Sequence, residues 1–255
     1  MDTSYILDGS IAIATAMNFP DRPTIVFLHD SLGCTELWRG FPQKLGQAAN
    51  CDIILYDRQG YGMSAPFNSP RANDYLEKEA DVLAQIIEIL EMKEAILFGH
   101  SDGGSISLLA AAKYPTKIAA VITEGAHIFV EEETLRGINE AIHLYQATNL
   151  KQKLQRFHGD KTEEMFWAWA ATWTSESFRK WNIENFLPAV ACPSLVIQGE
   201  ADEFGSLQQV DGIMNQVSGK ATKLIVPNAK HTPHKEMEQL VLESAAEFIL
   251  RLFPE

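Results

Sequence analysis

The chain has 255 residues, 46% of them hydrophobic and 22% charged, a composition typical of a folded globular protein rather than a disordered one. Its formal net charge of −13 argues against a nucleic-acid or anionic-membrane surface, because both require clusters of basic side chains. We therefore expect the partner to be a small, neutral or weakly polar molecule.

Three cysteines are scattered along the chain without C-x-x-C spacing, which predicts neither a disulfide framework nor a zinc cluster. The first residues lack the basic start and the apolar run of a signal peptide, and no window is apolar enough to span a membrane. These features favour a cytoplasmic protein that uses no metal ion. The oligomeric state is left open.

Apolar runs recur along the chain at intervals that suit strands. Residues 5–17 predict two short strands around the turn pair Asp8-Gly9. Six further runs are continuously apolar, which is typical of parallel strands covered on both faces: 24–28, 52–56, 95–98, 119–123, 194–198 and 222–226. Helical periodicity falls between or after these runs, at 76–90, 105–112 and 237–252. The alternation predicts an α/β fold with a doubly wound, mostly parallel sheet of eight strands.

One interval breaks this alternation. From about His127 to Pro188 no strand is predicted, only helical segments at 131–145 and 163–173. Four of the five tryptophans lie here, and Trp169 and Trp173 recur at helical spacing. Such an aromatic stripe packs as ordinary core or lines an apolar pocket under a helical lid, and both roles are compatible.

The stretch Gly99-His-Ser-Asp-Gly103 follows a predicted strand and precedes a predicted helix. Ser101 fits a simple helix N-cap, because serine is one of the residues preferred there. A cap needs no glycines, however, whereas a nucleophile on a strained strand-to-helix turn needs small residues two positions away on either side. We therefore favour Ser101 as a nucleophile.

A nucleophilic serine needs a histidine to take its proton and an acid to orient that histidine. His231 follows the last predicted strand and is the best base by position, while His234 competes but suits a structural role or the pocket rim. Asp202, in a loop bounded by two glycines after the preceding strand, is the best acid. Three other carboxylates are alternatives: Glu200, Glu203 and, at a different strand end, Glu124.

The other histidines are assigned different places. His100, inside the elbow, is badly placed to serve Ser101, and His143 and His158 are expected on the surface of the lid. His127, at the start of the lid, is a candidate polar contact for a substrate, although a hydrogen-bonded structural role is equally common for such a residue.

Two turns complete the pattern. Phe27-Leu-His29-Asp-Ser-Leu-Gly33 leaves an early strand and offers one backbone N–H to an oxyanion hole, and Asp102 offers the second from the positive end of its helix. The carboxylate of Asp102 is interpreted as incidental to the chemistry. Asp57 to Ser64 is interpreted as a structural turn in which Arg58 pairs with a carboxylate.

Five motifs in this order resemble those of the α/β-hydrolase family over essentially the whole chain. HDSLG resembles its oxyanion turn, DRQGYGMS its D-x-R-G-x-G-x-S turn, GHSDGG its elbow, GEADEFG its acid loop and KHTPH its histidine loop. The sequence departs from many members at Asp30 and Lys230, where glycine is common.

The resemblance implies the α/β-hydrolase fold, with a core domain of residues 1–126 and 189–255 and an inserted helical cap at 127–188. It also implies specific roles: a triad of Ser101, Asp202 and His231, and oxyanion N–H groups from Ser31 and Asp102. Four further residues are expected at the substrate pocket: His29, His127, Trp169 and Trp173.

The reaction implied is hydrolysis of a small apolar or aromatic ester through an acyl-enzyme, with no cofactor. Two alternatives stay open: a carbon–carbon bond hydrolase acting on ring-cleavage diketones, and a ligand-binding member of the fold without catalysis. Serine rather than aspartate at position 101 argues against the haloalkane dehalogenases and epoxide hydrolases of the family.

Overall fold

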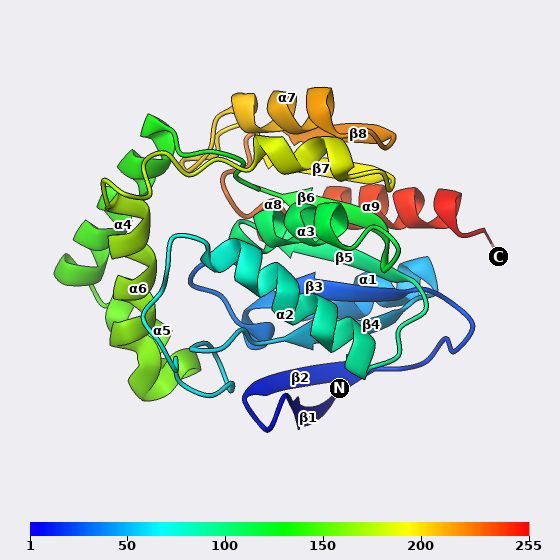
Figure 1. The fold of residues 1–255 in the computed structure, drawn as a ribbon, viewed down its shortest axis with the longest axis horizontal. Coiled ribbons are helices and arrows are strands. Elements are labelled where there is room, and N and C mark those ends of the chain that lie inside the picture. Colours follow the sequence, from blue (N-terminus) through cyan, green and yellow to red (C-terminus); the bar gives the residue numbers. More distant parts are fainter. Residues whose placement is uncertain (255) are drawn as a thin grey trace.

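Eight strands form a single sheet in the computed structural model, which describes residues 1–254 (Figure 1). Their order across the sheet is β1-β2-β4-β3-β5-β6-β7-β8. Strand β2 runs antiparallel to both of its neighbours, and the other pairings are parallel. The strands are β1 (Asp2–Ile6), β2 (Ile11–Ala16), β3 (Thr24–Leu28), β4 (Asp52–Tyr56), β5 (Ala95–His100), β6 (Ile118–Glu124), β7 (Ser194–Gly199) and β8 (Ala221–Val226).

The predicted doubly wound sheet is confirmed, and so is each of its predicted strands. Every residue of β3, β4 and β5 is buried, as expected of central parallel strands that are covered on both faces. The hairpin between β1 and β2 turns through Asp8 and Gly9, whose φ angles of 55° and 81° lie in the left-handed region that these two residue types tolerate.

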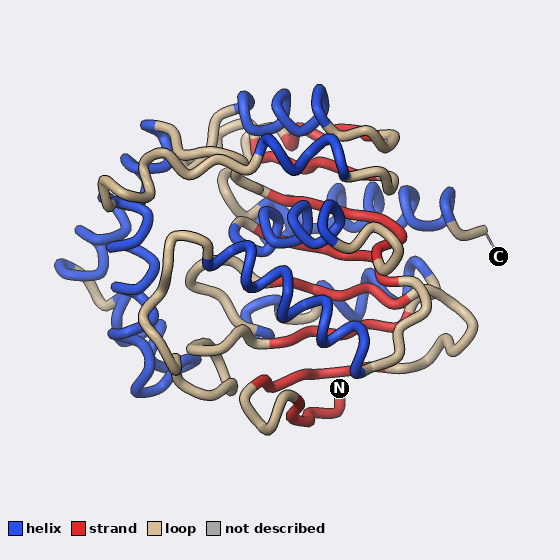
Figure 2. The backbone as a smooth tube through the Cα atoms, in the orientation of Figure 1, coloured by secondary structure: helices blue, strands red, loops and turns tan. Residues whose placement is uncertain are grey.

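Two layers of helices cover the sheet (Figure 2). One layer comprises α2 (Tyr75–Ile89), α3 (Asp102–Lys113) and α7 (Leu207–Gln216), and the other comprises α1 (Phe41–Ala49) and α9 (Glu238–Leu252). The short helix α8 (Pro233–Glu236) leads into α9, and 3₁₀ turns occupy Thr35–Trp38, Gly159–Lys161 and Glu184–Ala189. Within residues 1–254, no helix combines the length and apolarity needed to cross a membrane.

The segment between β6 and β7 is helical, and Figure 1 shows it at one end of the sheet. It contains α4 (Glu132–Ala147), α5 (Leu150–His158) and α6 (Thr162–Thr174). The tryptophan stripe of α6 is buried, with Trp169 and Trp173 exposing 4% and 2% of their surface. A division of the chain into a core and a cap domain at residues 127 and 188 stays a prediction.

Candidate active site

Ser101 stands at the sharp turn between β5 and α3. Its φ of 55° and ψ of −118° are strained for a residue with a side chain, and strain of this kind concentrates at functional sites. The Ser101 side chain makes no capping hydrogen bond to α3, so the simple N-cap interpretation fails. The Ser101 N–H donates to the carbonyl oxygen of Glu124 over 2.8 Å, which ties the turn to the end of β6.

Close packing explains the two glycines that flank this turn. A Cβ atom on Gly99 would lie 2.1 Å from the carbonyl oxygen of Gly103. A Cβ atom on Gly103 would lie 2.1 Å from the carbonyl oxygen of Leu28, at the end of β3. Only glycine therefore lets α3 start this close to the strands, as the sequence pattern predicts.

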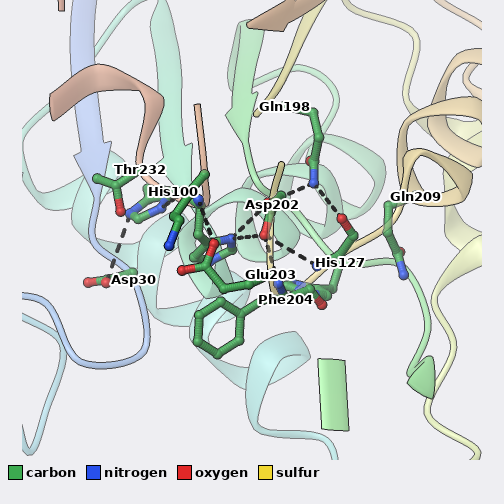
Figure 3. Close-up of polar contacts among 12 residues, drawn as sticks. Asp30, His100, His127, Gln198, Asp202, Glu203, Phe204, Gln209 and Thr232 are labelled. Carbon is green, nitrogen blue, oxygen red and sulfur yellow. Dashed lines mark hydrogen bonds and ion pairs between the residues drawn. The ribbon is translucent and has the colours of Figure 1, made fainter. Parts of the chain in front are cut away.

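His231 and Asp202 come together from the loops after β8 and β7. The Nδ1 atom of His231 lies 2.9 Å from both carboxylate oxygens of Asp202. The same carboxylate accepts hydrogen bonds from the Phe204 N–H at 2.8 Å and the Gln198 side-chain amide at 2.7 Å, and Figure 3 shows these groups around it. These three donors, around a side chain that is 1% exposed, hold the carboxylate in one orientation.

This pairing shifts the protonation of both groups. Burial lowers the pKa of His231, but the charge and hydrogen bond of Asp202, helped by Asp30 and Glu203, outweigh it and raise the pKa from 6.5 to about 9. For Asp202, burial opposes ionisation, yet the neighbouring His231 lowers its pKa overall. The acid is thus ionised at neutral pH, and Nδ1–H of His231 donates to it.

A cavity of about 180 Å³ opens beside these groups, between the carboxyl ends of the strands and the helical segment. Most of the predicted site residues line it, as do Asp30, Leu32, Thr134, Ile138, Glu203, Phe204 and Thr232. The predicted residues among them are Ser31, Ser101, Asp102, His127, Trp169, Trp173 and His231. Asp202 lies behind His231 rather than on the cavity wall.

The prediction that His29 lines the pocket is wrong. Its ring turns away from the cavity, with Nδ1 donating to the Asp30 carbonyl at 2.7 Å and Nε2 accepting from the Arg58 N–H at 3.1 Å. Burial, followed by the positive charge of Arg58, lowers the pKa of His29 well below its ordinary value, so the ring stays neutral. His29 thus joins the oxyanion turn to the Arg58 turn.

The prediction that His158 lies on the lid surface is also wrong, because the residue is 1% exposed. Its Nδ1 accepts a hydrogen bond from the Gly62 N–H at 3.0 Å, and its Nε2 donates to the Leu32 carbonyl at 3.0 Å. His158 therefore links α5 to two core turns. His143, in contrast, is exposed as expected.

The carboxylate of Asp102 makes structural contacts that the sequence does not indicate. Its carboxylate pairs with Arg58 at 3.3 Å and accepts a hydrogen bond from the Tyr75 hydroxyl at 2.9 Å. Trp173 of α6 in turn donates to that hydroxyl at 2.8 Å. This chain of buried contacts connects the elbow to the helical segment, and no pattern in the sequence pairs these residues. The partner expected for Arg58 is thereby found.

One group of side chains in residues 1–254 has atoms close enough to share a metal ion: His100, Glu124 and His234, within 4.8 Å of one another. However, Oε2 of Glu124 lies 2.5 Å from Nδ1 of His234. Two ligands bound to one zinc ion at about 2 Å each stand farther apart than that. Glu124 and His234 therefore form a hydrogen-bonded pair, and the His100 ring packs 5.3 Å from the His234 ring, centroid to centroid.

A family model described as "alpha/beta hydrolase fold" matches residues 23–182 of the chain. The chain belongs to the alpha/beta hydrolase fold family. Among curated relatives, it is 30% identical to "Serine hydrolase BPHL" of Mus musculus over 188 residues, which are 71% of this chain and 64% of the mouse protein. The alignment thus spans just under two thirds of that relative's length.

Two further comparisons show what the chain is similar to. It is 27% identical to a "2-hydroxy-6-oxononadienedioate/2-hydroxy-6-oxononatrienedioate hydrolase" of Paraburkholderia phymatum over 213 residues, 72% of each chain. A solved structure of a thermophilic esterase from Thermogutta terrifontis superposes with a TM-score of 0.74 at 18% identity and covers 99% of both chains. At that identity, the superposition shows the shared fold alone.

Proposed function

We propose that the chain is a serine hydrolase that cleaves a small carboxylic ester with an apolar or aromatic group. The observation that carries the proposal is Ser101 on its strained turn, in the same cavity as a histidine whose Nδ1 is held by a buried carboxylate. A family model and a curated relative named as a serine hydrolase support the same reaction class.

In the proposed mechanism, Ser101 Oγ attacks the ester carbonyl carbon while Nε2 of His231 accepts the hydroxyl proton. Asp202 stabilises the imidazolium that forms. The N–H of Asp102, as the first residue of α3, has no intrahelical partner, and together with the Ser31 N–H it would donate to the oxyanion. His231 then protonates the leaving alcohol, and a water molecule activated by His231 cleaves the acyl-enzyme to release the acid.

Cleavage of a carbon–carbon bond is the second candidate, because the Paraburkholderia relative is named as a hydrolase of dienedioates. A dioate carries two carboxylates, which basic side chains normally bind. None of the described residues that line the cavity is Lys or Arg, and Asp30 and Glu203 are acidic, while the carboxylate of Asp102 is paired with Arg58. The charge of the cavity therefore favours the ester over the dioate.

A substrate panel separates these candidates. We expect turnover of short p-nitrophenyl esters, no turnover of a ring-cleavage dienedioate, and a loss on the order of 10⁴-fold or more in kcat for Ser101→Ala. Turnover of the dienedioate alone would favour the second candidate. Tight ligand binding with no turnover of either substrate would favour a binding protein.

A further inference from the structure

A second acid–histidine pair is buried at the loop that carries His231. Glu124, the last residue of β6, is 0% exposed, and His234, in the first turn of α8, is 2% exposed. Oε1 of Glu124 accepts from the His234 backbone N–H at 2.6 Å, and Oε2 accepts from Nδ1 of the His234 ring at 2.5 Å. The carboxylate thus fixes both the backbone and the ring of His234.

His100 holds the other end of the same loop. Its Nε2 lies 2.8 Å from the carbonyl oxygen of His231, and because a carbonyl only accepts, Nε2–H is the donor. Burial, the dominant influence, lowers the pKa of His100 to about 4, so the ring is neutral at neutral pH. Figure 3 shows this ring between the histidine loop and Asp30, whose Oδ2 lies 4.0 Å from Nδ1.

Glu124 also reaches the nucleophile. Its carbonyl oxygen accepts the Ser101 N–H at 2.8 Å, while its carboxylate binds His234. One residue therefore connects the turn that carries the nucleophile to the loop that carries the base. Glu124 is not a substitute acid for His231, because both of its carboxylate oxygens bind His234 and Nδ1 of His231 faces Asp202.

Aromatic packing closes the back of the pair. The His234 ring lies 4.6 Å from the Trp38 ring, centroid to centroid, at an interplanar angle of 30°. Phe41 packs at 5.4 Å from the same ring. The His234 ring is therefore held on its faces by packing and at its edge by a charged hydrogen bond, an arrangement that restricts its motion.

We propose that Glu124 and His234, together with His100, are positioning residues that fix the His231 loop relative to Ser101. The inference rests on the proposed function, since positioning matters only if His231 serves Ser101. A misplacement of about 1 Å in a catalytic group can cost on the order of 100-fold in rate. Loss of this network should therefore lower the reaction rate by a measurable factor.

Three substitutions test the proposal. Glu124→Gln removes the charge that binds His234, and His234→Phe keeps an aromatic ring but removes the Nδ1 donor. His234→Asn restores a donor near the position of Nδ1 without the ring. His143→Asn, on the exposed side of α4, is the matched control.

We expect Glu124→Gln and His234→Phe to lower kcat and the rate of Ser101 labelling by a fluorophosphonate about 10- to 100-fold, with KM changed less than about twofold. His234→Asn should recover most of the rate, and His143→Asn should match the wild type. Wild-type kcat in well-folded Glu124→Gln and His234→Phe would overturn the proposal. The proposal would also be overturned if His234→Asn lost as much kcat as His234→Phe and if the loss of kcat followed the loss of Tm in both variants.

Proton NMR provides a readout that needs no activity. The wild type should show two downfield imidazole N–H resonances, one lost in Asp202→Asn and the other in Glu124→Gln. We expect Glu124→Gln also to shift the remaining His231 resonance, and an unmoved resonance would contradict the proposal. If the wild type neither labels nor turns over esters, the proposed function fails while this resonance still reports whether the network positions His231.

Discussion

His231 can accept the proton of Ser101 only in its neutral form. Because the pKa of His231 is raised to about 9, kcat/KM for an ester should rise with pH and reach half its maximum well above pH 6.5. Asp202→Asn removes the main influence that raises this pKa, so the midpoint should move to lower pH while the maximum rate falls. A pH–rate profile measures both, and a wild-type midpoint at or below 6.5 would contradict the assignment.

The same raised pKa makes stability fall as pH rises, whereas it makes kcat/KM rise. A histidine whose pKa is raised by folding stabilises the protein fully below its unfolded pKa of 6.5, and the contribution is lost as pH rises through about 9. Urea unfolding of the wild type and Asp202→Asn should therefore differ more at pH 6 than at pH 10. Equal differences at the two pH values would show that the pair does not carry this linkage.

Position 103 requires glycine because there is no room for a Cβ atom, and not because the residue takes part in the reaction. Gly103→Ala places a Cβ 2.1 Å from the Leu28 carbonyl, so α3 must shift, and we expect a loss of about 1–3 kcal/mol in the free energy of unfolding. Gly40→Ala is the matched control, since its Cβ would meet nothing closer than 3.9 Å. Denaturant unfolding measures both, and equal stabilities would refute the packing explanation.

At the scale of elements, His158 makes the helical segment a support for the oxyanion turn. His158→Phe leaves the Gly62 N–H and the Leu32 carbonyl without their partner, which should cost about 1–3 kcal/mol in stability and lower kcat more than KM. His143→Phe on the same segment should change neither quantity. If His158→Phe keeps full kcat, α5 does not support the turn.

The elements were largely predictable because the strands are buried on both faces and therefore carry continuous apolar runs. Helices α1, α5, α7 and α8 are not among the predicted elements. Helix α5 shows why, because it buries only Leu154 and His158, and apart from Leu150 and Phe157 its other positions are polar. Strand ends likewise indicated Ser101, Asp202 and His231 in advance, and their catalytic roles stay predictions. The places of His29, His158 and the Asp102 carboxylate depend on contacts between distant segments, which no local pattern records.

Across the whole molecule, the burial of the cysteine thiols predicts that they react slowly with thiol reagents. Burial raises the pKa of Cys51 and of Cys192 to about 11 and that of Cys34 to about 12, so thiolates are scarce at neutral pH. A disulfide reagent such as DTNB should react slowly with the native protein and quickly after unfolding in urea. Fast reaction of a thiol in the native state would contradict this packing.

Covalent labelling shows whether Ser101 is an activated nucleophile. A fluorophosphonate should add to the wild type once, peptide mapping should place the adduct on Ser101, and Ser101→Ala should stay unlabelled. His231→Ala should slow labelling strongly while the protein remains folded by circular dichroism. A folded wild type that stays unlabelled, or an adduct on another residue, would contradict the claim.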